Sequence, residues 1–368
     1  MAPRYPWLML LLLAACGGSS GATEAGSGTD AATATGTTPT TTATTTAAAT
    51  TGTGETTAAA TTIPDSTTGD PTTTAPTTDG STSATTGAVD PPASLDDVVD
   101  GPLEMIADGH MFTEGPVWSP EGYLLYSDIP ADTIFRWVEG QGSAPFITPS
   151  GKSNGLAFDA MGRLLAAEHG PRRVSRRTIG DAAVAVADQF MGLPLNSPND
   201  LALRSDGTIY FTDPPYGIAP MDQEQPFQGV FRVDPRGAVS LVADDFDRPN
   251  GIALSPDETQ LYIDDTALEH VRVFAVQPDG SASGGAVFID LKSDLPGNPD
   301  GMAVDEFGDL YVTGGGGVRV VTPAGELLGT IAVPESATNC TFGDPDGRAL
   351  FITAPPKVYR IRLKVAGA

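Results

Sequence analysis

One order of polar and apolar positions recurs six times between Glu114 and Ala354. Each copy opens with an acid or amide residue, runs through a short apolar stretch and a tight acidic or glycine-containing turn, and ends in a second apolar stretch. The opening residues are Glu114, Asn154, Asn199, Asn250, Asp300 and Asn339, which lie 39 to 51 residues apart. A period of this length is typical of propeller blades, because one four-stranded unit cannot bury its own faces. The pattern therefore predicts an all-β fold, a six-bladed β-propeller.

The six opening residues belong to types that are depleted in strands and costly to bury without a partner. In a propeller, equivalent positions of the innermost strands surround the central channel, so these side chains are expected to converge at one mouth of it. Carboxylate and amide oxygens together would form a cage suited to a hard divalent cation such as calcium. The alternative is that each residue merely caps a turn before its strand, but Glu114 shares the position and is a poor turn residue.

Loops that follow the second strand of each blade are expected on the same face as the cage. The loop over residues 213–229 lacks a strong strand pattern, and long loops in compact domains are usually functional, so it is the best lid candidate. It contains Tyr216. His169 is one of three histidines and is also expected near the mouth, although a lone histidine is more often structural than catalytic. These two residues, with Asn154 and Asn199, are the predicted substrate-binding positions.

Seven short motifs occur in an order that resembles one known family. They are Thr113-Glu-Gly-Pro-Val-Trp118, Ser153-Asn-Gly-Leu-Ala-Phe-Asp159, Glu168-His-Gly, Leu195-Asn-Ser-Pro-Asn-Asp200, Phe211-Thr-Asp-Pro-Pro-Tyr-Gly217, Arg248-Pro-Asn-Gly-Ile-Ala253 and Asn298-Pro-Asp-Gly-Met302. Over about residues 103 to 364 the chain resembles the gluconolactonase and senescence-marker-protein (regucalcin-like) family. Seven motifs in order are far more specific than any one of them.

The resemblance implies a six-bladed propeller that holds one divalent metal, commonly calcium, with zinc, magnesium or manganese as other ions to consider. It implies that Glu114, Asn199, Asn250 and Asp300 are the metal ligands and that Asp300 is also the proton acceptor and donor. Family members hydrolyse sugar lactones or, in some branches, organophosphates. The implied substrate is therefore a small lactone.

The cage suggests how such a reaction would proceed. A bound cation would polarise the lactone carbonyl and lower the pKa of a nearby water, and Asp300 would take the proton from that water and return it to the leaving alkoxide. A role for Asp300 as a ligand alone stays open. So do two other functions: phosphotriester hydrolysis in the same cage, and a non-enzymatic propeller that binds a ligand on its face, for which no cage would be needed.

Other sequence motifs give little further indication of function. The chain has no His-Glu-x-x-His or phosphate-loop sequence. The glycine run at 314–317 indicates a tight loop, not a nucleotide cradle. Asn339-Cys-Thr fits the glycosylation pattern, but its place on an inner strand argues against modification.

The first hundred residues differ from the rest. Residues 1–16 combine Arg4, an apolar run and a Leu-Ala-Ala-Cys16 ending, which is similar to a bacterial lipoprotein signal with Cys16 as the lipidation residue; an ordinary signal peptide is the alternative. Residues 17–95 are rich in Thr, Ala, Gly and Pro and are expected to form a disordered tether, with O-glycosylation left open. The propeller domain is assigned to residues 96–368. The expected location is the cell envelope, with the lipid as the sole membrane contact.

Charge and cysteine content bear on the partners of the protein and on how its ring is closed. The formal net charge is −26, of which about −17 falls on residues 101–368, and this argues against nucleic acid or anionic membranes as partners. If Cys16 is lipidated, Cys340 has no disulfide partner, and a small buried thiol is its expected role. Ring closure is therefore expected from pairing of residues 103–108 with the last blade. Oligomeric state is left open.

Overall fold

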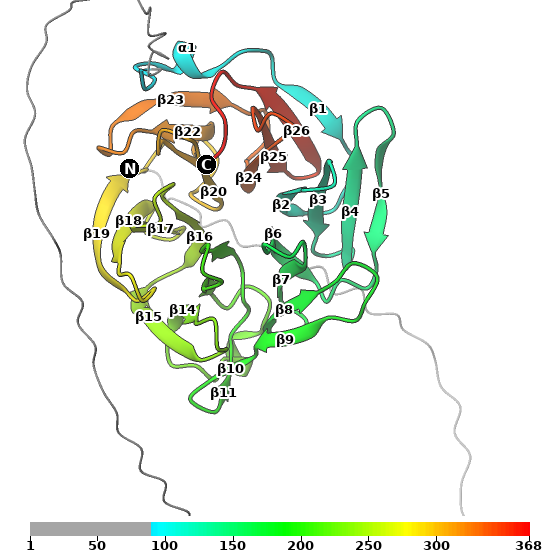
Figure 1. Cartoon of the computed structure of the whole chain (residues 1–368), viewed down its shortest axis with the longest axis vertical. Coiled ribbons are helices and arrows are strands. Elements are labelled where there is room, and N and C mark those ends of the chain that lie inside the picture. Colours follow the sequence, from blue (N-terminus) through cyan, green and yellow to red (C-terminus); the bar gives the residue numbers. More distant parts are fainter. Residues whose placement is uncertain (1–89) are drawn as a thin grey trace, which may run out of the picture. The chain divides into compact units, whose positions relative to one another are not determined.

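The computed structural model describes residues 90–368. The predicted signal, Cys16 and nearly all of the predicted tether lie outside these described residues. Within residues 90–368, no helix is long and apolar enough to cross a membrane. The described part contains six four-stranded antiparallel sheets arranged around a ring (Figure 1). The predicted all-β, six-bladed propeller is confirmed.

The first three blades follow the order of the repeats. Blade one is β2 (Thr113–Ser119), β3 (Tyr123–Asp128), β4 (Thr133–Val138) and β5 (Gly142–Ile147). Blade two is β6 (Ser153–Phe158), β7 (Leu164–Glu168), β8 (Arg173–Arg177) and β9 (Val184–Ala187). Blade three is β12 (Leu201–Leu203), β13 (Ile209–Asp213), β14 (Gln228–Val233) and β15 (Val239–Phe246).

The remaining blades complete the ring. Blade four is β16 (Pro249–Leu254), β17 (Gln260–Asp265), β18 (His270–Val276) and β19 (Ala282–Asp290). Blade five is β20 (Met302–Val304), β21 (Leu310–Gly314), β22 (Gly317–Val321) and β23 (Leu327–Ala332). Blade six is β24 (Asn339–Gly343), β25 (Ala349–Ala354), β26 (Lys357–Arg362) and β1 (Glu104–Ala107).

The second strands of the blades form the core. A tyrosine in four of them is almost fully buried: Tyr126, Tyr210, Tyr262 and Tyr311. These strands are sandwiched between neighbouring blades on both faces, so their side chains bury apolar area in either direction. This explains why they appear in the sequence as continuous apolar runs and not as alternating ones.

The ring is closed by the N-terminal strand. β1 pairs antiparallel with β26, with Glu104 opposite Arg360 and Ala107 opposite Val358, and the two lie side by side in Figure 1. The short helix α1 (Leu95–Val98) precedes it, and Lys364 N donates to the Val98 carbonyl at 2.8 Å. The predicted closure by residues 103–108 is therefore confirmed, and it satisfies the edge of the last blade.

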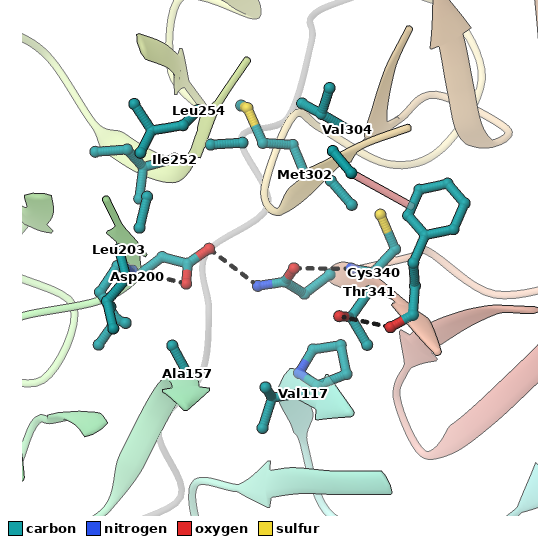
Figure 2. Close-up of a pocket in the computed structure, with 18 of the residues that line it drawn as sticks. Val117, Ala157, Asp200, Leu203, Ile252, Leu254, Met302, Val304, Cys340 and Thr341 are labelled. Atoms are coloured by element: carbon teal, nitrogen blue, oxygen red, sulfur yellow. Dashed lines mark hydrogen bonds between the residues drawn. The ribbon is translucent and has the colours of Figure 1, made fainter. Parts of the chain in front are cut away.

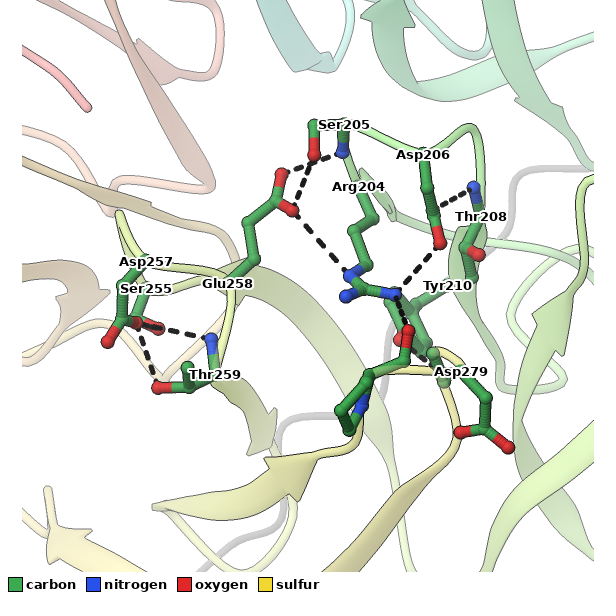
Figure 3. A network of polar contacts seen from close by, with 12 residues as sticks. Arg204, Ser205, Asp206, Thr208, Tyr210, Ser255, Asp257, Glu258, Thr259 and Asp279 are labelled. Carbon is green, nitrogen blue, oxygen red and sulfur yellow. Dashed lines mark hydrogen bonds and ion pairs between the residues drawn. The ribbon is translucent and has the colours of Figure 1, made fainter. Parts of the chain in front are cut away.

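The turns after the inner strands lie on the face opposite the predicted mouth, the rear face. There the turn after β12 is tied to the turn after β16: Ser205 donates to Glu258 through its backbone N–H and its hydroxyl, both at 2.7 Å. Arg204 lies 3.6 Å from the same carboxylate (Figure 3). This polar network fixes blade three against blade four far from the cage.

One small element lies outside the blades. A two-stranded hairpin of β10 (Gln189–Phe190) and β11 (Leu193–Pro194) projects before blade three. Gln225 donates through Nε2 to the carbonyls of Phe190 and Leu193, both at 3.1 Å. Sequence periodicity did not predict this hairpin, which supports the long loop after β13.

Candidate metal centre and active site

The six opening residues of the repeats occupy equivalent places around the channel. Glu114, Asn154, Asn250 and Asn339 lie at the start of inner strands, while Asn199 and Asp300 lie two residues before the first residue of β12 and of β20. All are buried except Asp300, which is partly exposed. The register of β2 with β3 places Glu114 opposite Ser127, at the end of the blade where the β3–β4 loop begins. The predicted convergence at one mouth is thus found.

Direct contacts join these residues in two groups. Asn154 Nδ2 donates to Asn199 Oδ1 at 2.6 Å. Asp300 contacts both Glu114 and Asn250, and Asn250 Nδ2 also donates to Thr266 Oγ1 at 3.0 Å. Three of the four residues expected to bind metal, Glu114, Asn250 and Asp300, therefore lie in contact, and the fourth, Asn199, is bonded to Asn154.

A close approach between blades explains why glycine follows the opening residue in four copies. A Cβ added to Gly115 would lie 2.0 Å from the Asn154 carbonyl oxygen, and one added to Gly301 would lie 2.0 Å from the Asn339 side chain. Each glycine thus leaves room for the opening residue of the next blade. The Asn-Gly motif is a packing requirement of the cage.

In the third copy Asp200 stands where four other copies have glycine. Its side chain projects into the channel and accepts a hydrogen bond from Asn339 Nδ2 at 3.2 Å (Figure 2). Only 8% of Asp200 is exposed. The sequence analysis did not select this residue, although the interruption of the Asn-Gly pattern was a visible signal.

Asp264, on β17, is a second acid that was missed. It is fully buried, and neither carboxylate oxygen has a hydrogen-bond partner within residues 90–368. Most corresponding positions hold a hydroxyl residue: Ser127 and Thr212 donate to backbone carbonyls of the next blade, at 2.8 and 2.7 Å. An acid in a hydroxyl position was the signal in this case.

Burial and mutual repulsion perturb these four acids strongly. Burial, followed by the charge of Asp200, raises the pKa of Glu114 to about 8, and burial raises the pKa of Asp200 to about 7. The pKa values of Asp264 and Asp300 also lie well above the ordinary range, first because of burial and then because of neighbouring carboxylates. The cluster is therefore unfavourable in its ionised form unless a positive charge is present.

His169 lies in the wall of the mouth. His169 is 6% exposed. A Cβ added to Gly217 would lie 2.7 Å from the Cβ of His169, so the loop after β13 packs directly on the histidine. Burial and the charge of Lys152 lower the pKa of His169 to about 4, which leaves the imidazole neutral at pH 7. Its Nε2 has no hydrogen-bond partner among the described residues.

Tyr216 is presented by the long loop after β13, which contains only the short 3₁₀ helix η1 (Pro220–Asp222). The ring is 37% exposed and lies under the guanidinium of Arg248, 5.4 Å from its centroid. Burial and then the charge of Asp300 raise the pKa of Tyr216 to about 12. Tyr216 is therefore close enough to the cage to sense Asp300.

The remaining predicted motifs have structural roles. Cys340 is buried, and its Sγ lies 3.4 Å from the Tyr311 carbonyl. Asn339 is buried on an inner strand, where a glycan cannot be attached. The glycine run forms the tight connection in which Gly314 pairs with Gly317. These three expectations agree with the structure.

A cavity of about 430 Å³ opens the channel from the rear face. It is lined by residues of the inner strands, including Leu203, Ile252, Met302 and Val304, and the side chain of Asp200 points toward its centre (Figure 2). Asp200 is thus reached from this rear cavity.

The residues at the mouth fit a divalent cation. Asn154 Oδ1 and both oxygens of Asp264 are buried and have no donor within the described residues, and repulsion between Glu114 and Asp300 would be relieved by a cation. Among residues 90–368, no three acid, histidine or cysteine side chains form a ready ligand set by themselves. Amide oxygens must therefore contribute, and an all-oxygen set favours a hard ion.

Comparisons with known proteins agree with this geometry. The sequence profile described as the SMP-30/Gluconolactonase/LRE-like region matches residues 112–355. A gluconolactonase from Zymomonas mobilis is 35% identical over 303 residues, covering 74% of this chain and 85% of that protein. The pentonolactonase of Haloferax volcanii is 29% identical and covers 65% of this chain and 80% of its own length.

A solved structure shows the same similarity in three dimensions. The gluconolactonase from Xanthomonas campestris superposes with a TM-score of 0.68 at 35% identity, over 74% of this chain and 92% of that chain. Fold and site define a propeller with an oxygen-rich cage at one mouth. The chain belongs to the SMP-30/gluconolactonase/LRE-like family.

Proposed function

We propose that this protein is a lactone hydrolase that uses one divalent cation, with calcium as the first choice. The observation that carries the proposal is the contact of Asp300 with Glu114 and Asn250 at one mouth of the channel, together with the Asn154–Asn199 hydrogen bond. The relatives named above act on sugar lactones, which favours a sugar lactone over a phosphotriester as substrate. Family membership and the cage together argue against a purely structural propeller.

In this mechanism Glu114, Asn199, Asn250 and Asp300 would hold the cation. Bound there, the cation would supply Lewis-acid polarisation of the lactone carbonyl and a lower pKa for nearby water. Asp300 is the acid of the cage that remains partly exposed, so its carboxylate can meet substrate and water. It accepts the proton of the attacking water and returns it to the ring oxygen as the ester bond breaks.

Other side chains orient the substrate. The Asn154–Asn199 pair offers amide groups for hydroxyl or carbonyl oxygens, and His169 offers a neutral ring nitrogen. Tyr216 covers the mouth from the side of the long loop, and closure by this loop would exclude water from the site. These assignments are proposals for the same pocket.

The test is the substitution Asp300→Asn. Loss of general acid-base catalysis is expected to lower kcat for gluconolactone by about 10²- to 10⁴-fold, measured by proton release, while the melting curve stays cooperative. Asp294→Asn, on the exposed connection to the same blade, is the matched control and should retain activity. Wild-type turnover by folded, metal-loaded Asp300→Asn would refute the assignment, and turnover of a phosphotriester but no lactone would refute the substrate class.

A further inference from the structure

Basic side chains on the mouth face differ in their partners. Four of them are held in ion pairs: Arg172 with Glu224, Arg173 with Glu168, Lys292 with Asp290 and Lys357 with Glu335. Arg248 and Lys152 are exposed, and neither makes an ion pair within the described part of the chain. These two cationic side chains at the rim of the site are therefore available to bind an anionic ligand.

Arg248 is fixed in place by its backbone and by its neighbour. Its N–H donates to Asp265 Oδ1 at 3.1 Å, and its carbonyl accepts from Thr266 N at 3.0 Å. The guanidinium carbon lies over the ring of Tyr216, 5.4 Å from its centroid. A guanidinium held over an aromatic ring in this way still has N–H groups that can donate to a ligand.

The position of Arg248 is continuous with the cage. Thr266, which holds the Arg248 carbonyl, accepts a hydrogen bond from Asn250 Nδ2 at 3.0 Å and donates to the Pro299 carbonyl at 2.8 Å, directly before Asp300. Arg248, Tyr216, Thr266 and Asn250 thus form one wall that runs from the rim to the proposed metal ligands.

Lys152 adds a second charge between blades one and two. It lies two residues before Asn154, and its charge is one of the causes that lower the pKa of His169. His169 in turn packs against Gly217, the neighbour of Tyr216. Lys152 and Arg248 therefore border the same mouth.

We propose that Arg248 binds an anionic substituent of the lactone, a carboxylate or a phosphate carried away from the reacting ester, and that Lys152 assists by attraction. The planar guanidinium can donate two parallel hydrogen bonds to such a group. The charge of about −17 on residues 101–368 would otherwise repel an anionic substrate. This inference rests on the proposed lactone hydrolysis and names the substrate class of that site.

The experiment compares kcat/KM for neutral gluconolactone, a phosphorylated gluconolactone and a glucarolactone in the calcium-loaded full chain. The wild type is expected to prefer at least one anionic substrate, and which one wins separates phosphate from carboxylate. In Arg248→Gln the ratio of anionic to neutral kcat/KM should fall roughly tenfold, the size of a hydrogen bond to a charged group. Arg248→Lys should recover part of it, since charge returns without the planar fork.

Lys292→Gln removes a cation from the same face that is already paired and exposed, so its ratio should equal that of the wild type. An unchanged ratio in Arg248→Gln, with neutral lactone still hydrolysed, overturns the inference and leaves the proposed function intact. If no lactone is hydrolysed, calorimetry measures the binding of gluconate, phosphogluconate and glucarate to both proteins. The anion site is supported if the wild type binds phosphogluconate or glucarate more tightly than gluconate and Arg248→Gln does not. Equal binding by the two proteins overturns the inference.

Discussion

Replacement of Glu114 by glutamine is expected to raise stability in a chelator and lower it in calcium. The pKa of Glu114 in the native state is raised to about 8, whereas the ordinary pKa of glutamate is 4.5. Between these values the native state binds more protons than the unfolded state, so the free energy of unfolding of the metal-free protein falls as pH rises. Glu114→Gln removes this titration and keeps an oxygen for the Gly115 N–H, which lies 2.7 Å from the carboxylate.

The magnitude follows from the same difference. Each pH unit between the two values changes the free energy of unfolding by at most about 1.4 kcal/mol. Because Asp300 shares the charge of the cluster, we expect about 2 kcal/mol between pH 5 and pH 7, or roughly 4 to 8 °C in Tm for a domain of this size. In calcium the order should reverse, since the cation stabilises the native wild type and the neutral amide introduced by Glu114→Gln is a weaker ligand than the carboxylate.

The assay is thermal unfolding of both proteins at pH 5, 7 and 8, once in chelator and once in calcium. Glu121→Gln, at an exposed turn of the same blade, controls for the loss of one surface carboxylate and should show no reversal. The reasoning fails if Glu114→Gln melts below the wild type in chelator at pH 8, or if the difference between the two proteins is independent of pH.

Two further outcomes test packing and export. Gly301→Ala places a Cβ 2.0 Å from the Asn339 side chain, so it should lower the free energy of unfolding, measured by urea titration, by about 1–3 kcal/mol and weaken metal binding. Gly101→Ala, whose added Cβ would have its nearest neighbour 3.7 Å away, should be neutral. Equal effects of the two substitutions would contradict the packing argument. Cys16→Ser should abolish fatty-acid labelling of the full chain in a bacterial host, and labelling that persists would exclude Cys16 as the lipidation residue.

The repeat predicted the fold because it records a physical requirement that is the same in every blade. Each opening residue must face the channel, and the glycine that follows it in four copies must admit the next blade, so the copies share one pattern of polar and apolar positions. Ring closure was also predictable, since an unpaired last blade needs a partner strand. The hairpin before blade three was not, because its four residues carry no periodicity of their own.

Asp200 and Asp264 show the limit of the same approach. Both break the repeat: Asp200 replaces a glycine, and Asp264 occupies a position where other copies have a hydroxyl residue. A repeat is recognised from the residues that its copies share, so a residue found in only one copy is not selected. Differences between copies point to what the channel centre needs, and only the fold shows that these two acids approach Glu114 and Asp300.

The seam between β1 and β26 bears on the order of events during folding. Its partners, such as Ala107 and Val358, are separated by nearly the whole domain, so the loop that must close is the longest the ring contains. Blades one to five can assemble from neighbouring segments as they emerge, but β1 has no strand to join until β26 exists. During that interval both ends of the growing ring expose unpaired edges, and a partner chain in the same condition could pair with them. The seam that supplies the fourth strand of the last blade is thus also where synthesis of the ring is most open to misassembly.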